Sequence, residues 1–210
     1  MQLEGKIINF LGDSITQGVG TTSCENTFHY LIKKKYNVKY AYNCGVGGTR
    51  IARHTVPSMD AIYDLYFELR AETMDKNADL IVVFGGTNDY GHGDALFGDV
   101  DSDDICTFCG AVNSLISKLE RDFPKAEIVF MTPLHRIGEE VPSKPEGKIL
   151  EDYVNAIRTI CKKRGIALID LFEMNPLDPN DKVLVPDGLH PSDAGHKIMA
   201  EVIGEELIKI

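Results

Sequence analysis

Strand-like and helix-like segments alternate along the whole chain, and this alternation restricts the fold more than any other feature. Strand-length runs lie near 6–11, 38–43, 79–85, 126–132 and 166–171. Helical patterns lie near 25–35, 57–75, 104–122, 148–164 and 192–208. Repeated strand–helix units favour a parallel sheet with crossover helices. Because the runs 80–84 and 128–131 are continuously apolar, we expect helices on both faces of their strands.

The pattern predicts an α/β fold, a flavodoxin-like three-layer α/β/α sandwich around a five-stranded parallel sheet. Among the doubly wound arrangements, the strand order 2-1-3-4-5 suits five strands. The chain has 210 residues, of which 43% are hydrophobic and 26% charged, as in one globular domain of ordinary composition. No repeat, low-complexity tract or Pro/Gly-rich linker divides it. We therefore expect residues 1–210 to form a single domain with one core.

The charge balance limits the partners that the chain can bind. Its 22 basic and 32 acidic residues give a net charge of -10, which disfavours non-specific binding to nucleic acid or to an anionic membrane. The first residues do not resemble a signal peptide, and no apolar run has the length of a membrane span. Five scattered cysteines favour reduced thiols over a disulfide framework. We expect a cytoplasmic protein that binds neither nucleic acid nor membranes.

A serine follows the first strand directly. Gly12, Asp13 and Ser14 come straight after the run 6–11, at the end where open parallel sheets bind their ligands. Ser14 is therefore the candidate nucleophile. Serine and aspartate are also preferred helix N-caps, so capping of the following helix is the alternative role for this pair.

An acid and a histidine lie close together near the end of the chain. Asp187 and His190 are three residues apart, and Pro191 then favours the start of the last helix. Serine attack on a carbonyl carbon needs a base and a carboxylate that orients the base. Ser14, His190 and Asp187 can fill these roles as a catalytic triad. For an isolated Asp-x-x-His, the alternative is a helix cap beside a surface histidine.

Two further strand ends carry groups that can stabilise an oxyanion. The second strand runs into the glycine-rich turn 45–48, where backbone N–H groups can approach a ligand closely. The third strand runs into 85–89, which places the carboxamide of Asn88 beside the same crevice. A tight turn at the glycines and a local turn at Asn88 are the structural alternatives.

Four blocks at these strand ends, in this order, resemble the SGNH hydrolase superfamily, the GDSL-type esterases and lipases. They are Gly-Asp-Ser at 12–14, the segment 43–48, Gly-x-Asn-Asp at 86–89 and Asp-x-x-His at 187–190. The resemblance spans nearly the whole chain. It implies a triad of Ser14, Asp187 and His190, and an oxyanion hole formed by the N–H groups of Ser14 and Gly48 and the side chain of Asn88. It also implies metal-independent ester hydrolysis through an acyl-serine.

The order serine, aspartate, histidine also occurs in α/β-hydrolases, whose nucleophile motif is Gly-x-Ser-x-Gly. Thr16 occupies the last position of that motif here, and the serine follows the first of only five predicted strands. These differences exclude that fold. Within the GDSL block, Ile15 replaces the leucine of the family name, which is a conservative change.

The motifs predict a serine esterase that hydrolyses a small, soluble carboxylic ester with a short acyl chain, for example an acetylated carbohydrate. No basic amphipathic helix or apolar lid indicates an interfacial lipase. Lysophospholipid or thioester hydrolysis, and acyl transfer to another acceptor, use the same triad and stay open. A module that binds a small ligand without turnover is the alternative of another class, although 45–48 matches neither phosphate-binding motif.

The remaining polar residues indicate no cofactor and no metal, because no His, Cys, Asp and Glu set has metal-site spacing. The long loops 90–98 and 134–147 leave strand ends and are expected to rim the site. His92 and His135 lie on these loops, and His135 and Arg136 are candidates for contact with the substrate or the leaving group. Ordinary surface loops are the alternative. The other histidines are expected to be packed or surface residues: His29, His54 and His196.

Overall fold

The computed structural model describes all residues 1–210 and confirms the parallel sheet in the order β2-β1-β3-β4-β5. Its strands are β1 (Ile7–Gly12), β2 (Tyr40–Gly45), β3 (Leu80–Phe84), β4 (Glu127–Met131) and β5 (Ala167–Ile169). Every neighbouring pair is parallel. β1 therefore lies between β2 and β3, so the segments that follow these three strands leave the sheet side by side.

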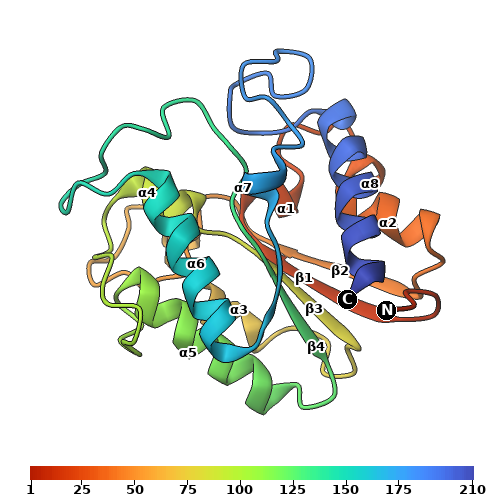
Figure 1. Cartoon of the computed structure of the whole chain (residues 1–210), viewed down its shortest axis with the longest axis horizontal. Helices are drawn as coiled ribbons and strands as arrows, with labels where there is room; N and C mark the ends of the chain where they lie inside the picture. The colour runs from red at the N-terminus through yellow and green to blue at the C-terminus, as the bar shows by residue number, and fades with distance from the viewer.

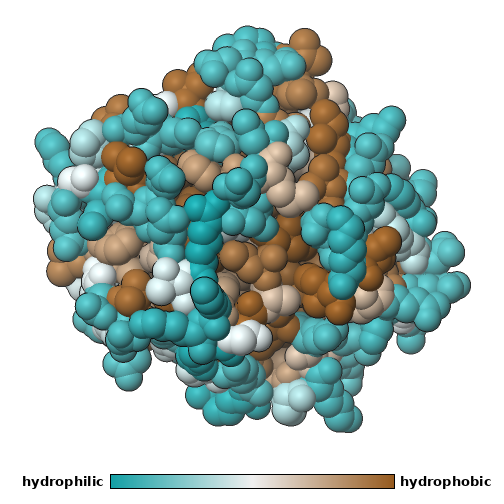
Figure 2. Space-filling view, in the orientation of Figure 1, coloured by the Kyte–Doolittle hydropathy of each residue, from teal (hydrophilic) through white to brown (hydrophobic).

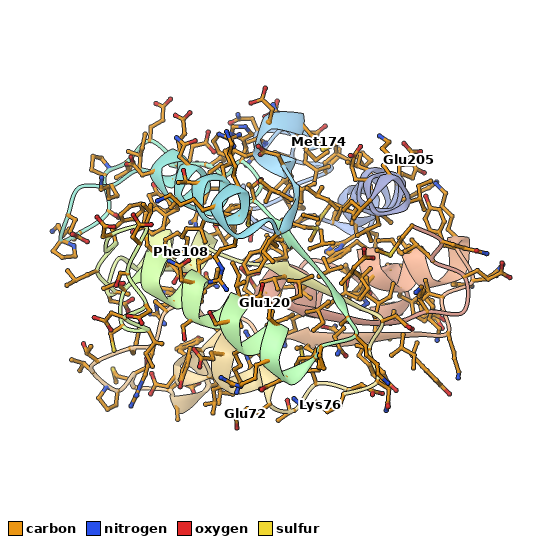
Figure 3. The ribbon with its side chains drawn as sticks, turned by 60° about the horizontal axis from the view of Figure 1, so that its bottom comes forward. Glu72, Lys76, Phe108, Glu120, Met174 and Glu205 are labelled. Atoms are coloured by element: carbon orange, nitrogen blue, oxygen red, sulfur yellow. The ribbon has the colours of Figure 1, made fainter.

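Helices cover both faces of the sheet (Figure 1). One layer holds α3 (Phe67–Ala71), α5 (Phe108–Asp122) and α6 (Leu150–Arg164), and the other holds α2 (Phe28–Lys35) and α8 (Asp193–Lys209). The turned view brings α5 forward, with Phe108 and Glu120 labelled along it (Figure 3). The predicted three-layer α/β/α arrangement is confirmed.

The hydrophobic core has two parts because the sheet divides it. One cluster of 26 buried residues lies against α3, α5 and α6, and a second of 21 lies against α2 and α8. Side chains of β3 alternate between them, as the period of a strand requires: Ile81 and Val83 in the first, Leu80, Val82 and Phe84 in the second. The sequence predicts one core, whereas a sheet covered on both faces makes two.

Two of the predicted helices are wrong in extent. The segment 57–75 holds only the 3₁₀ turn η2 (Ala61–Asp64) and α3, because Tyr66 between them has extended backbone angles. The segment 25–35 is divided into η1 (Cys24–Asn26) and α2, because Thr27 is extended and its hydroxyl donates to the Cys24 carbonyl. In both places an apolar pattern of helical period continues across a backbone break.

The molecular surface is largely hydrophilic on the face of Figure 1. Figure 2 shows hydrophobic residues on this face in the space between α6 and α8. None of the helices combines the length and the apolar character needed to cross a membrane. All five cysteines are free, and Cys109 and Cys161 are buried in the core, where a thiol packs as a small apolar group.

Candidate active site

Ser14 is the first residue of the short helix α1 (Ser14–Gln17), directly after β1. The cap of this helix is Asp13, whose carboxylate accepts a hydrogen bond from the Ile15 N–H at 3.0 Å. The turn from strand to helix is tight, since a Cβ on Gly12 would lie 2.0 Å from Oγ1 of Thr16. Because Asp13 caps the helix, the hydroxyl of Ser14 is available for other contacts.

Three side chains from opposite ends of the chain form one hydrogen-bonded series. His190 Nε2 lies 3.0 Å from Ser14 Oγ, and His190 Nδ1 lies 2.6 Å from Asp187 Oδ2. The other Asp187 oxygen accepts the backbone N–H groups of Leu189 at 2.9 Å and His190 at 2.7 Å. The loop 187–190 is thus folded around the carboxylate of Asp187. This carboxylate holds the imidazole ring of His190 so that Nε2 lies toward Ser14.

The carboxyl group of Asp187 is held in its charged form. Partial burial raises its pKa, but hydrogen bonds from the backbone and side chain of His190 and from the Leu189 N–H outweigh this effect and lower the pKa to about 2. Asp187 is therefore ionised at neutral pH. A carboxylate in this place holds an imidazole in one tautomer and stabilises its protonated form.

Ser14, Gly48 and Asn88 line the same hollow, and each offers a hydrogen-bond donor. The backbone N–H groups of Ser14 and Gly48 donate to no acceptor within the chain, whereas the N–H of Gly47 donates to Oε1 of Gln17 at 2.6 Å. The carboxamide of Asn88 comes from α4 (Thr87–His92), which follows β3. These groups can surround an oxygen that becomes negatively charged at a carbon attacked by Ser14.

Asn88 and the turn after β2 are joined through Thr49. Asn88 Nδ2 donates to the Thr49 carbonyl at 2.9 Å, and the Thr49 hydroxyl accepts from the Arg70 guanidinium at 2.9 Å. Arg70 also donates to the carbonyls of Cys44 and Leu65. Arg70 was not predicted as a site residue, because it lies in the segment 57–75 that was interpreted as one helix.

Two carboxyl groups behind the site are buried without a salt bridge. Burial raises the pKa of Asp13 to about 6, although the Ile15 N–H and Arg70 oppose this shift. Burial also raises the pKa of Asp89 to about 6, against the hydrogen bonds from the N–H groups of Ala52 and Ile51. Asp89 thereby ties the chain after Gly48 to α4.

A hollow of about 420 Å³ opens over these groups. Its polar lining includes Ser14, Gly48, Asn88 and His190. Its apolar lining comes from three separate segments: Val19, Ile62, Tyr63 and Leu189. Ile62 and Tyr63 were not predicted as site residues; they line the hollow because η2 replaces the long helix predicted there.

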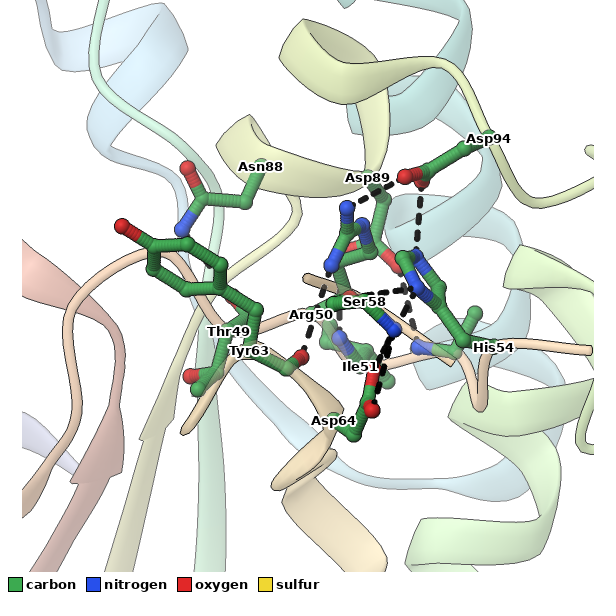
Figure 4. Close-up of polar contacts among 11 residues, drawn as sticks. Thr49, Arg50, Ile51, His54, Ser58, Tyr63, Asp64, Asn88, Asp89 and Asp94 are labelled. Atoms are coloured by element: carbon green, nitrogen blue, oxygen red, sulfur yellow. Dashed lines mark hydrogen bonds and ion pairs between the residues drawn. The ribbon is translucent and has the colours of Figure 1, made fainter. Parts of the chain in front are cut away.

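A polar cluster supports η2 from behind (Figure 4). His54 Nε2 lies 2.8 Å from an Asp94 oxygen, and Arg50 pairs with the other oxygen of Asp94. The Ser58 N–H donates to both oxygens of Asp64 at 3.1 Å. Arg50 also reaches the carbonyl of Tyr63 at 3.5 Å. The cluster therefore fixes the wall of the hollow that carries the Tyr63 ring.

The three candidate residues from the rim loops have different surroundings in the structure. His92 lines the hollow. His135 is not among the residues that line the hollow. Its Nδ1 lies 2.8 Å from Glu139 Oε1 and its Nε2 lies 3.0 Å from the Phe172 carbonyl, so both ring nitrogens have contacts within the chain. Arg136 lies beside His92 over α4 and donates to Thr87.

The histidines outside the site follow their expected roles in packing. His29 and His196 are buried, and burial lowers the pKa of each to about 4. His196 Nδ1 accepts the Phe28 N–H at 3.2 Å. His54 belongs to the cluster behind η2. No group of three or more His, Cys, Asp or Glu side chains is arranged to hold a metal ion.

The match to a family model decides the family of the chain. The model of the GDSL-like lipase/acylhydrolase family matches residues 10–198. The chain belongs to this family. GDSL-like acylhydrolases are carboxylic ester hydrolases, and the resemblance seen in the four sequence blocks is thereby confirmed.

Solved structures place this GDSL-like acylhydrolase among proteins of the same fold. One protein of known crystal structure is 30% identical to this chain in sequence. The match covers 100% of this chain and 99% of that protein, with a TM-score of 0.87. A Lactobacillus plantarum protein is 26% identical over 98% of both chains, with a TM-score of 0.82. An acetyl xylan esterase is 25% identical over 94% of this chain and 98% of its own, with a TM-score of 0.63. A comparison with curated proteins gives no match.

Proposed function

We propose that this GDSL-like acylhydrolase is a serine esterase that hydrolyses small esters with a short acyl chain through an acyl-enzyme on Ser14. The hydrogen-bonded series of Asp187, His190 and Ser14 carries this proposal. In this geometry His190 Nε2 can take the hydroxyl proton as Ser14 Oγ attacks the ester carbonyl carbon.

The negative charge then develops on the carbonyl oxygen of the substrate. The free N–H groups of Ser14 and Gly48 and the second Nδ2 hydrogen of Asn88 donate to that oxygen. When the tetrahedral intermediate collapses, the bond to the alcohol oxygen breaks and His190 returns the proton to the leaving alcohol. Water repeats the same steps on the acyl-serine, releases the acid and restores the Ser14 hydroxyl.

The size and lining of the hollow support a short acyl chain. About 420 Å³ is shared between the acyl group and the alcohol. Its walls combine a few apolar side chains with the polar groups of the site. The likeness to an acetyl xylan esterase supports acetylated carbohydrate as the substrate class.

Hydrolysis of p-nitrophenyl esters from acetate to long acyl chains tests the proposal. The wild type is expected to prefer acetate, and Ser14→Ala is expected to lose the activity. Ser117→Ala on α5 is the matched control, because Ser117 is exposed there. Equal activity of the wild type and Ser14→Ala would overturn the proposal, and a preference for long chains would overturn its substrate class.

A further inference from the structure

A second hollow lies beside the first one. It has a volume of about 350 Å³ and lies between α4 and the segment that follows β4. His92 lines both hollows, so they are neighbours at this residue. The Ile137 N–H donates to the Gly188 carbonyl at 2.9 Å, which joins the wall of the second hollow to the loop that carries His190.

The charge of this second hollow is opposite to that of the whole chain. It is lined by Arg136 and Lys144 and by no acidic residue, although the chain has a net charge of -10. Neither cation has a carboxylate within ion-pair distance. The nearby carboxylate of Glu139 is occupied by the ring of His135 and by the backbone N–H of Arg136.

The guanidinium of Arg136 has donors to spare. Its Nη1 donates to the carbonyl of Thr87 at 3.2 Å and to the Thr87 hydroxyl at 3.1 Å, while its buried Nε has no partner. Partial burial lowers the pKa of this arginine, although the charges of Asp13, Asp187 and Glu139 act in the opposite direction. A half-buried cation with free N–H groups is stabilised when an anion binds it.

We propose that the second hollow binds an anionic group of the substrate, a carboxylate or a phosphate, while the ester lies at Ser14. The proposal rests on the proposed esterase function and specifies that the ester substrate carries a negative charge. A guanidinium recognises either anion through two parallel N–H···O bonds, and Lys144 adds a second positive charge. Arg136 is thereby a specificity residue that acts away from the reacting atoms.

Matched ester pairs test this proposal. The first pair is 4-acetoxybenzoate and its neutral methyl ester, with the charge on the alcohol part. The second is monophenyl succinate and its neutral methyl ester, with the charge on the acyl part. We expect kcat/KM in the wild type to be higher for the charged ester of at least one pair. In Arg136→Gln, the ratio of kcat/KM for the charged ester to that for the neutral ester is expected to fall by about tenfold or more. A hydrogen bond to a charged group contributes about 1.5–3 kcal/mol.

Two further variants keep the test informative. A Cβ on Gly91 would lie 2.8 Å from Nη1 of Arg136, so Gly91→Ala displaces the guanidinium without removing it and is expected to reduce the same preference. Arg121→Gln removes an exposed arginine on α5 and is expected to keep it. No preference for a charged ester in the wild type, or an unchanged preference in Arg136→Gln, would overturn the proposal.

Failure of this inference differs from failure of the esterase function. If neutral esters are hydrolysed in a Ser14-dependent manner without a preference for charge, only the inference fails. If the wild type hydrolyses none of the four esters, the esterase function fails. Competitive inhibition of neutral-ester hydrolysis by benzoate or by phenyl phosphate identifies the anion, with benzyl alcohol as the neutral control. Equal inhibition by all three would contradict the anionic site.

Discussion

Asn88 Nδ2 donates a hydrogen bond to the carbonyl oxygen of Thr49 at 2.9 Å. The nitrogen of a side-chain carboxamide carries two hydrogens. The contact with Thr49 uses one of them, and the other is free to donate into the hollow. Thr49 is in turn held by Arg70. The orientation of the Asn88 carboxamide is therefore set before any substrate binds, and such preorganisation is what oxyanion stabilisation requires.

Asn88→Ala is expected to lower kcat on p-nitrophenyl acetate by roughly 10²–10³, the usual effect of removing one oxyanion donor. KM should change far less, because the donor acts mainly in the transition state. Asn77→Ala in the exposed loop before β3 is the control. A kcat of Asn88→Ala close to wild type would remove Asn88 from the mechanism.

Gly48→Ala is expected to lower kcat at least tenfold, for two structural reasons. Gly48 has a φ of +74°, and a Cβ there would lie 2.3 Å from the Tyr63 ring. L-residues adopt this backbone region at a cost of roughly 1–2 kcal/mol. Tyr63→Ala in the same chain removes the clash but not the strain, so the double variant should recover part of the activity. Full additivity of the two changes in a double-mutant cycle would contradict this contact.

Asp187→Asn should lower kcat on the order of 10³–10⁴, since an amide cannot stabilise the protonated imidazole. Because the pKa of Asp187 is lowered to about 2, its protonation does not limit the wild type above pH 4. The acid limb of the kcat profile should therefore show no step from this carboxyl group. A carboxyl titration between pH 4 and 5 that disappears in Asp187→Asn would argue against this assignment.

Asp13→Asn is expected to raise the free energy of unfolding at neutral pH. The pKa of Asp13 is raised to about 6 in the folded chain by burial. The folded chain therefore holds a proton that the unfolded chain releases near pH 4, and stability falls as pH rises from 4 to 6. A shift of about two units corresponds to about 3 kcal/mol. Asparagine removes this loss, so the variant should be more stable above pH 6 and equal to wild type below pH 4.

Urea unfolding at pH 4 and pH 7 measures this difference. Asp122→Asn is the control of opposite sign, because hydrogen bonds from the side chains of Arg121 and Lys118 lower the pKa of Asp122. That variant should be slightly less stable at pH 7. An Asp13→Asn variant that is less stable than wild type at pH 7 would show that the charge of Asp13 stabilises the fold.

The sequence was sufficient for the sheet and for the residues at its carboxyl edge. Continuous apolar runs such as 80–84 are specific for buried parallel strands. Polar residues at the ends of such strands must meet at one edge, which brings Ser14 and Asn88 together. The Asp187–His190 pair is local in the chain, so its loop could be interpreted without tertiary information.

The wall of the hollow could not be predicted in the same way. Ile62 and Tyr63 continue an apolar pattern of helical period, and nothing local reveals that Tyr66 is extended. Arg70 contacts Thr49 and His54 contacts Asp94, and both of these partners lie more than ten residues away in the chain. The pairing of His135 with Glu139 is a local i to i+4 contact, and it could have been recognised from the sequence.

Covalent labelling with a fluorophosphonate tests the central claim most directly, because such a reagent reacts with a serine that a histidine base activates. We predict one adduct per chain in the intact mass, located on Ser14 by peptide sequencing, and none in Ser14→Ala or His190→Ala. An adduct on another serine, or equal labelling of wild type and Ser14→Ala, would contradict the account.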